Sequence, residues 1–116
     1  MIFPLYHKVL NNQRLNDILK NKVLKVHPKI GAVCLTRDKQ YLSNRPIVLV
    51  FDYHELKYNM KVKPFCYNGY LNVHYPDQIW KPDIDEMEER CYGNINLKKY
   101  LKKIIINNKI CYENFT

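Results

Sequence analysis

Ile47-Val48-Leu49-Val50-Phe51 is the stretch of the sequence that decides the fold. Its residues are all β-branched, aliphatic or aromatic, which favours a strand, and the run is too short for a buried helix. Pro46 precedes the run and Asp52 follows it, and both residue types are typical of strand boundaries. This is the strongest strand signal in the chain, and we expect it to form the central strand of a sheet.

One main helix and several further strands are predicted around this run. Leu15, Ile18 and Leu19 fall at helical spacing after a possible cap at Asn11 or Asn12. Asp52 can cap one short helical turn. The other predicted elements are an opening strand at residues 3–7, an extended basic stretch at 23–27, an interior strand at 31–38, a more exposed strand at 58–67, a short helix capped by Asn96, and strands at 104–106 and 110–112.

The chain has 116 residues, of which 47% are apolar and 26% charged. That length and composition suit one modest core, so we expect residues 1–116 to form a single domain. The predicted fold class is α+β, with two small, mainly antiparallel sheets and one main N-terminal helix. Aromatic and proline residues without periodicity predict an ordered surface loop at 69–85, where Trp80 could stack on a base or simply pack within the loop.

The sequence predicts no membrane association. It contains no run of about eighteen apolar residues and no signal-peptide pattern at its start, so we expect a cytoplasmic protein. The net charge of +8 favours an anionic partner such as a nucleic acid, a nucleotide or an acidic protein surface. Scattered lysines also arise without any binding role, and the sequence leaves that alternative open.

The cysteine and histidine residues do not predict a metal site. Cys34, Cys66, Cys91 and Cys111 are widely spaced, and none has a histidine at ligand spacing. Their apolar neighbours predict free thiols that pack as small hydrophobic side chains in a reducing compartment.

Asp85-Glu86-Met87-Glu88-Glu89-Arg90 gathers carboxylates in one stretch. If the stretch is a strand, Glu86 and Glu88 face one site and Glu89 is turned away. Two neighbouring carboxylates repel, so one can hold or take a proton while the other accepts hydrogen bonds. If it is a helix, Glu86 and Arg90 form an ordinary surface ion pair. Composition alone favours the helix.

A resemblance across the chain favours the strand. The segments that carry it are, in order, Leu5-Tyr6-His7, Leu15 to Leu19 with Leu24, Cys34-Leu35-Thr36-Arg37-Asp38, Ile47 to Asp52, Lys63-Pro64-Phe65, Glu86 to Arg90, and Leu97 to Ile104. Together they resemble small phage-encoded proteins related to ADP-ribosyltransferases. The chain is similar, more distantly, to the tRNA 2′-phosphotransferase and to the DNA-modifying toxins of the same superfamily.

The resemblance implies a cleft that binds nicotinamide adenine dinucleotide (NAD). It implies that His7 contacts the ribose or pyrophosphate, that Thr36 lines the nicotinamide pocket, and that Arg37 lies near the phosphates. Tyr41 is then a candidate stacking ring. The implied catalytic residue is Glu88, which would stabilise positive charge as nicotinamide leaves, with Glu86 engaging the acceptor.

The function implied by this resemblance is transfer of ADP-ribose from NAD to a host protein or nucleic acid, by a phage or other mobile-element protein in the host cytoplasm. The alternative is a non-catalytic basic phage protein, either an inhibitor of host defence or a minor virion component. Such a protein would use the same fold to bind a host protein or nucleoprotein complex. The sequence does not indicate an oligomeric state.

Overall fold

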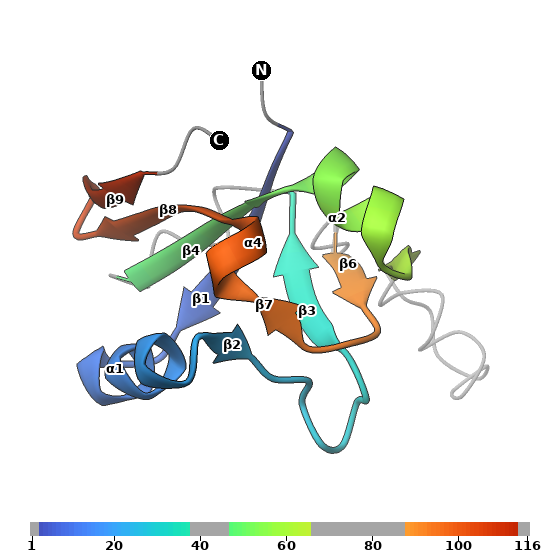
Figure 1. Cartoon of the computed structure of the whole chain (residues 1–116), viewed down its shortest axis with the longest axis horizontal. Coiled ribbons are helices and arrows are strands. Elements are labelled where there is room, and N and C mark those ends of the chain that lie inside the picture. The colour runs from blue at the N-terminus through green and yellow to red at the C-terminus, as the bar shows by residue number, and fades with distance from the viewer. Residues whose placement is uncertain (1–2, 38–46, 66–87, 114–116) are drawn as a thin grey trace, which may run out of the picture.

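The apolar run forms strand β4 (Ile47–Asp52) in the computed structural model, which describes residues 3–37, 47–65 and 88–113. β4 lies between β1 (Pro4–Val9) and β8 (Leu101–Ile106) and pairs antiparallel with both (Figure 1). Residues 47–51 are all buried. The prediction that this run forms an interior strand is confirmed, because pairing on both edges satisfies its backbone while packing covers both of its faces.

Seven strands of the described residues form one sheet in the order β5-β6-β3-β1-β4-β8-β9, and every pairing is antiparallel. A two-stranded sheet, β2-β7, lies beside it. The remaining strands are β2 (Val23–Leu24), β3 (Val33–Thr36), β5 (Val62–Phe65), β6 (Glu88–Cys91), β7 (Ile95–Asn96) and β9 (Lys109–Glu113).

The described helices begin where the sequence offers caps. Asn11 caps α1 (Asn12–Asn21) by accepting a hydrogen bond from the backbone N–H of Arg14, and Asn96 caps α4 (Leu97–Tyr100) in the same way. α2 (Tyr53–Asn59) follows β4 directly. There the Asp52 carboxylate accepts from the backbone N–H of Phe3 and makes no side-chain cap bond to α2.

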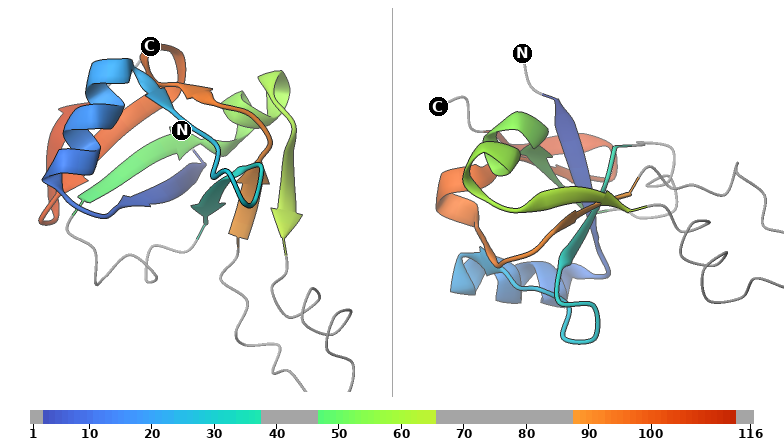
Figure 2. Two further views of the ribbon diagram at one scale, coloured as in Figure 1. Left: turned by 90° about the horizontal axis from the view of Figure 1, so that it is seen from below. Right: turned by 90° about the vertical axis from the view of Figure 1, so that its right-hand side faces the viewer.

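Alternation along the strands gives the large sheet two distinct faces. The core face carries Leu49 and Phe51, and the three helices of the described residues and the small sheet pack against it (Figure 2). The outer face carries Val48 and Val50, which pack with Tyr6 and Ile105. Most of the buried apolar side chains belong to the core face.

The predicted fold class is confirmed at the level of a mainly antiparallel α+β domain with one main N-terminal helix. The division into two small sheets differs, because β1 and β4 join the strands into one seven-stranded sheet and leave only β2 and β7 apart. The predicted strand at 58–67 is partly wrong. Tyr58 lies in α2, where burial of Leu56 anchors the helix, and the strand begins at Val62.

Within the part of the chain that the structure describes, no helix is long and apolar enough to cross a membrane. The predicted aromatic loop at 69–85 lies outside the described residues.

The cysteines differ in their surroundings. Cys91 is buried, as predicted, and burial raises the pKa of its thiol to about 11. Cys34 is half-buried, and Cys111 is exposed on β9, where the expectation of a packed thiol is wrong because that strand ends the described sheet. Cys66 lies outside the described residues.

Truncating a side chain at the centre of the sheet should lower the free energy of unfolding far more than truncating one at the surface. Leu49 is 0% exposed, so Leu49→Ala should lower the free energy of unfolding by about 2–5 kcal/mol through lost burial and a residual cavity. Leu10 is 58% exposed, and Leu10→Ala should change it by about 0.5 kcal/mol or less. Urea unfolding of both variants measures this. Equal effects would contradict the placement of β4.

Candidate functional site

Three predicted site residues lie on the neighbouring strands β6, β3 and β1. Thr36 at the end of β3 stands opposite Glu88 of β6 on one side and Tyr6 of β1 on the other. Residues opposite each other in antiparallel pairs project to the same face. Thr36 and Glu88 therefore share the outer face of the sheet. Residues 88–91 form a strand, which is the alternative under which Glu88 was expected to face the site.

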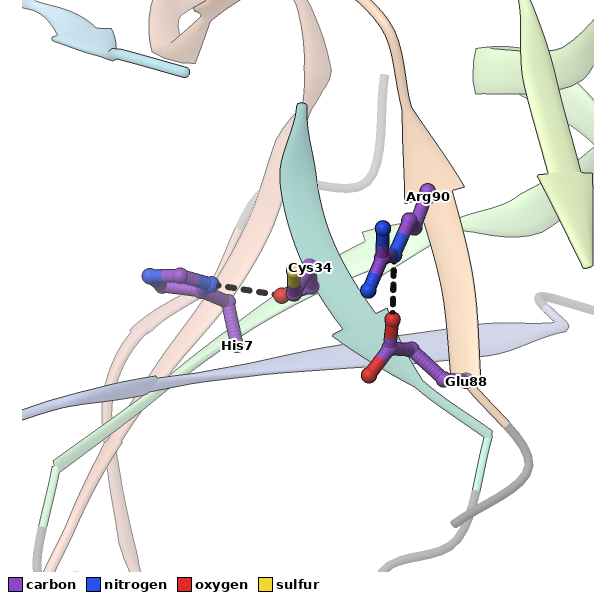
Figure 3. A network of polar contacts seen from close by, with 4 residues as sticks. All are labelled: His7, Cys34, Glu88 and Arg90. Atoms are coloured by element: carbon purple, nitrogen blue, oxygen red, sulfur yellow. Dashed lines mark hydrogen bonds and ion pairs between the residues drawn. The ribbon is translucent and has the colours of Figure 1, made fainter. Parts of the chain in front are cut away.

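His7 occupies the place where β1 and β3 separate. The registered pairing of these two strands is confined to Tyr6 and Thr36. Beyond it, Nδ1 of His7 lies 2.9 Å from the backbone oxygen of Cys34 (Figure 3). The imidazole therefore replaces ladder hydrogen bonds at this point and ties the two strands together.

That hydrogen bond fixes the form of the His7 ring. A carbonyl oxygen can only accept, so Nδ1 carries the proton and Nε2 is left as an acceptor. Burial lowers the pKa of His7, and the hydrogen bond to Cys34 offsets part of this shift. His7 is therefore a neutral hydrogen-bond acceptor at neutral pH. It lies on the core face, because it alternates with Tyr6 and shares its side of β1 with Leu5 and Val9.

A small hollow of about 180 Å³, here called the β1–β3 depression, brings three of the predicted residues together. Its lining residues are Tyr6, His7, Lys8, Cys34, Leu35, Thr36 and Glu88. His7, Thr36 and Glu88 thus border one hollow. His7 contributes from the junction of the strands rather than from the outer face, and Figure 3 shows its ring and the Glu88–Arg90 pair on either side of β3.

A larger hollow of about 680 Å³, here called the α1–β1 groove, adjoins the depression. Both are lined by His7, Lys8 and Cys34. The groove adds Arg14 and Lys25 as cations, one acidic residue, Asp17, and apolar walls from α1, β2 and β3. Its size suits a small organic ligand, and its charge suits an anionic one.

Glu88 is held in place by a short ion pair. Nε of Arg90 donates to Oε2 of Glu88 at 2.6 Å, and the two side chains are 20% and 17% exposed. They are alternate residues of β6 and share the outer face (Figure 3). The carboxylate beside Thr36 is thus oriented and its charge is balanced.

Glu89 projects to the opposite face from Glu88, as predicted, but that face is the buried one. Glu89 stands opposite Leu35 on the core face and is 4% exposed. Its Oε1 lies 3.4 Å from Nε of Arg37, and its Oε2 has no hydrogen-bond partner among the described residues. Burial raises the pKa of Glu89, against the opposing effect of Arg37 and Lys57.

Arg37, expected near the phosphates of a dinucleotide, instead pairs with Glu89 and lines neither hollow. Tyr41 and Glu86 lie outside the described residues, as does Trp80. Within the described ranges, no group of three or more His, Cys, Asp or Glu side chains is placed to hold a metal ion.

Three site features were not anticipated from the sequence. Lys8 and Arg14 line the groove, and only their positive charge could have suggested a role. The partner of His7 is a backbone carbonyl, which leaves no signal in the sequence. Burial of Glu89 depends on which face of β6 meets the core, and a run of adjacent acidic residues does not specify that choice.

The raised pKa of Glu89 predicts a specific pH dependence. The folded protein binds this proton more tightly than the unfolded chain, so this group's contribution to stability is full at low pH and is lost as pH rises through the folded pKa. Glu89→Gln removes that loss. The unfolding free energy of the variant minus that of the wild type should therefore increase with pH above the ordinary carboxyl range.

Urea unfolding at a series of pH values measures this difference. Leu10→Ala, at a 58% exposed residue whose side chain does not titrate, is the control and should give a difference that does not change with pH. A difference for Glu89→Gln that falls as pH rises would mean that attraction to Arg37 and Lys57 outweighs burial.

Comparisons with known proteins identify no relative. The chain matches no protein-family model, no curated protein and no solved structure.

Proposed function

We propose that this chain binds NAD at the junction of β1, β3 and β6 and transfers ADP-ribose to a host protein or nucleic acid in the host cytoplasm. The observation that carries the proposal is that His7, Thr36 and Glu88, from three different strands, border one depression. Three of the six residues expected from the sequence to act together therefore border the same hollow.

The residues of the two hollows fit parts of a dinucleotide. Lys8, Arg14 and Lys25 supply positive charge for phosphates, and the apolar walls of the groove suit a base. The neutral His7 ring offers Nε2 as an acceptor for a hydroxyl group. Arg37 does not fit its expected role as a phosphate contact, because it pairs with Glu89.

Glu88 is the residue to which we assign charge stabilisation. NAD supplies a glycosidic bond whose cleavage leaves positive charge on the ribose. A carboxylate that is already oriented lowers the free energy of such charge without reorganising, and Arg90 holds Glu88 in one orientation at the depression.

Glu88→Gln tests the catalytic assignment. It should reduce cleavage of NAD labelled in the nicotinamide by about 10²–10³-fold, the usual loss when one fixed electrostatic group is removed. Glu113→Gln, which removes an exposed carboxylate at the far end of the sheet, should leave cleavage unchanged. Thermal unfolding of both variants checks their folding. Cleavage that is absent in the wild type, or unaffected by Glu88→Gln, would contradict the assignment.

A second function, a non-catalytic basic phage protein that binds a host protein or nucleoprotein complex, is favoured by the charge arrangement. Basic residues outnumber acidic ones by 19 to 11. Two of the acidic side chains are paired within the chain, Glu55 with Lys102 and Glu89 with Arg37. In this alternative the Glu88–Arg90 pair is structural, and the surface left over is strongly basic.

The second function makes a separable prediction. A complex isolated from host lysate on the immobilised chain should survive Glu88→Gln and His7→Ala, because neither removes a lysine or arginine from the surface. It should weaken with added salt and with Lys8→Glu combined with Arg14→Glu, because these changes act on the electrostatic attraction. Loss of the complex in Glu88→Gln alone would contradict a purely electrostatic binding role.

A further inference from the structure

A third hollow, of about 310 Å³, lies between the end of α1, α4 and the β8–β9 hairpin, and is here called the α1–α4 hollow. Its described lining residues are Leu19, Lys22, Leu97, Lys98, Leu101, Ile104 and Tyr112. None of these seven residues lines the depression or the groove. The α1–α4 hollow is therefore a separate candidate site, which the proposed function does not use.

The floor of this hollow is apolar and its walls are partly open to solvent. Leu97, Leu101 and Ile104 belong to the buried core and form the floor. Leu19 and Tyr112 form the walls and are 38% and 42% exposed. Covering such apolar surface removes it from water, which is favourable. The hollow therefore favours a ligand with an apolar body.

Backbone hydrogen bonds hold the hollow in shape by joining α1 to α4. The N–H of Lys22 donates to the carbonyl oxygen of Leu19 at the end of α1, and the carbonyl oxygen of Lys22 accepts from the N–H of Leu97. The Asn96 side chain caps α4 from the other side. A ligand would therefore meet walls that are already ordered, which lowers the entropy cost of binding.

The charges of the lining favour an anionic head group. Lys22 and Lys98 are exposed cations, and none of the described lining residues is acidic. The ion pairs of the described residues include neither lysine. The described lining adds one further polar side-chain group, the hydroxyl of Tyr112. Sugars and nucleosides need several well-placed hydrogen-bonding groups, so this lining does not suit them.

We infer that the α1–α4 hollow binds a free medium-chain carboxylate. The aliphatic chain lies against the leucine, isoleucine and tyrosine side chains, and the carboxylate is attracted to Lys22 and Lys98. The methylene stems of the two lysines add apolar contact while their charged ends stay in water. The hollow lies at the small end of the range for organic ligands, which suits a single chain better than a two-chain lipid or a protein segment.

Titration of the uniformly ¹⁵N-labelled full chain with octanoate and decanoate, each below its micelle concentration, tests this site. Amide shifts should saturate at residues 19–22, 97–104 and 112. Decanoate should bind more tightly than octanoate by about fourfold for each added methylene group. Absence of saturable shifts, or shifts centred on the α1–β1 groove instead, would overturn the proposal.

Removal of the two cations tests the role of the head group. Lys22→Gln combined with Lys98→Gln should weaken decanoate binding by about three- to tenfold and leave binding of decanol unchanged, because the alcohol carries no charge. Lys20→Gln combined with Lys29→Gln is the matched control, since both lysines are exposed and line none of the three hollows. Equal weakening by the two pairs of substitutions would mean that net charge alone attracts the ligand, which would contradict the site.

Truncation of a wall residue tests the apolar contact. Tyr112→Ala should weaken binding of decanoate and of decanol alike, by about tenfold, because both ligands lose the same apolar surface. Tyr58→Ala is the matched control, because Tyr58 is 89% exposed and lines none of the three hollows. Amide spectra of all variants without ligand check their folding. Tyr112→Ala that binds decanoate as the wild type does would contradict the placement of the chain.

Vesicles of phosphatidylglycerol distinguish a free carboxylate from a lipid surface. The proposal predicts that decanoate saturates the hollow in solution and that the Lys22→Gln, Lys98→Gln chain sediments with vesicles no less than the Lys20→Gln, Lys29→Gln chain does. Vesicle binding that depends specifically on Lys22 and Lys98, with no saturable binding of decanoate, would overturn it.

Discussion

Burial of β4 on both faces is the constraint on which the rest of the structure depends. All residues from 47 to 51 are buried, and a single helical layer can cover only one face of the strand. The helices and the small sheet cover the core face, while Tyr6 and Ile105 from the adjacent strands pack around Val48 and Val50 on the outer face. Tyr6 belongs to β1 and Ile105 to β8, so the two strands that pair with the edges of β4 also cover its outer face.

The candidate site lies where the pairing of β1 with β3 is interrupted. β1 pairs along its whole length with β4 but meets β3 in register only at Tyr6 and Thr36. His7 bridges the opening through the carbonyl oxygen of Cys34, and the depression and the groove meet at these residues. The His7 side chain that links these two strands therefore also borders both hollows of the proposed ligand site. The position of Glu88 follows in turn, because β6 pairs with β3.

Several elements of the fold could be predicted from local patterns, because strand propensity and helix capping depend only on residues close together in the sequence. The apolar run at 47–51 and the caps at Asn11 and Asn96 specify β4, α1 and α4 without reference to the rest of the chain. The joining of the strands into one large sheet could not be predicted, since it depends on which edges meet. At the site, alternation correctly separated Glu88 from Glu89. It could not identify the buried face, and it gave no indication that Arg37 would be neutralised by Glu89.

The central claim is that His7, Thr36 and Glu88 form one ligand-binding site with the α1–β1 groove. The most direct measurement is a titration of the uniformly ¹⁵N-labelled chain with NAD, followed by amide chemical shifts. The account predicts saturable shifts at residues 6–8, 34–36 and 88 and along the groove. An absence of shifts at saturating NAD, or shifts confined to the β8–β9 hairpin at the other end of the sheet, would contradict it.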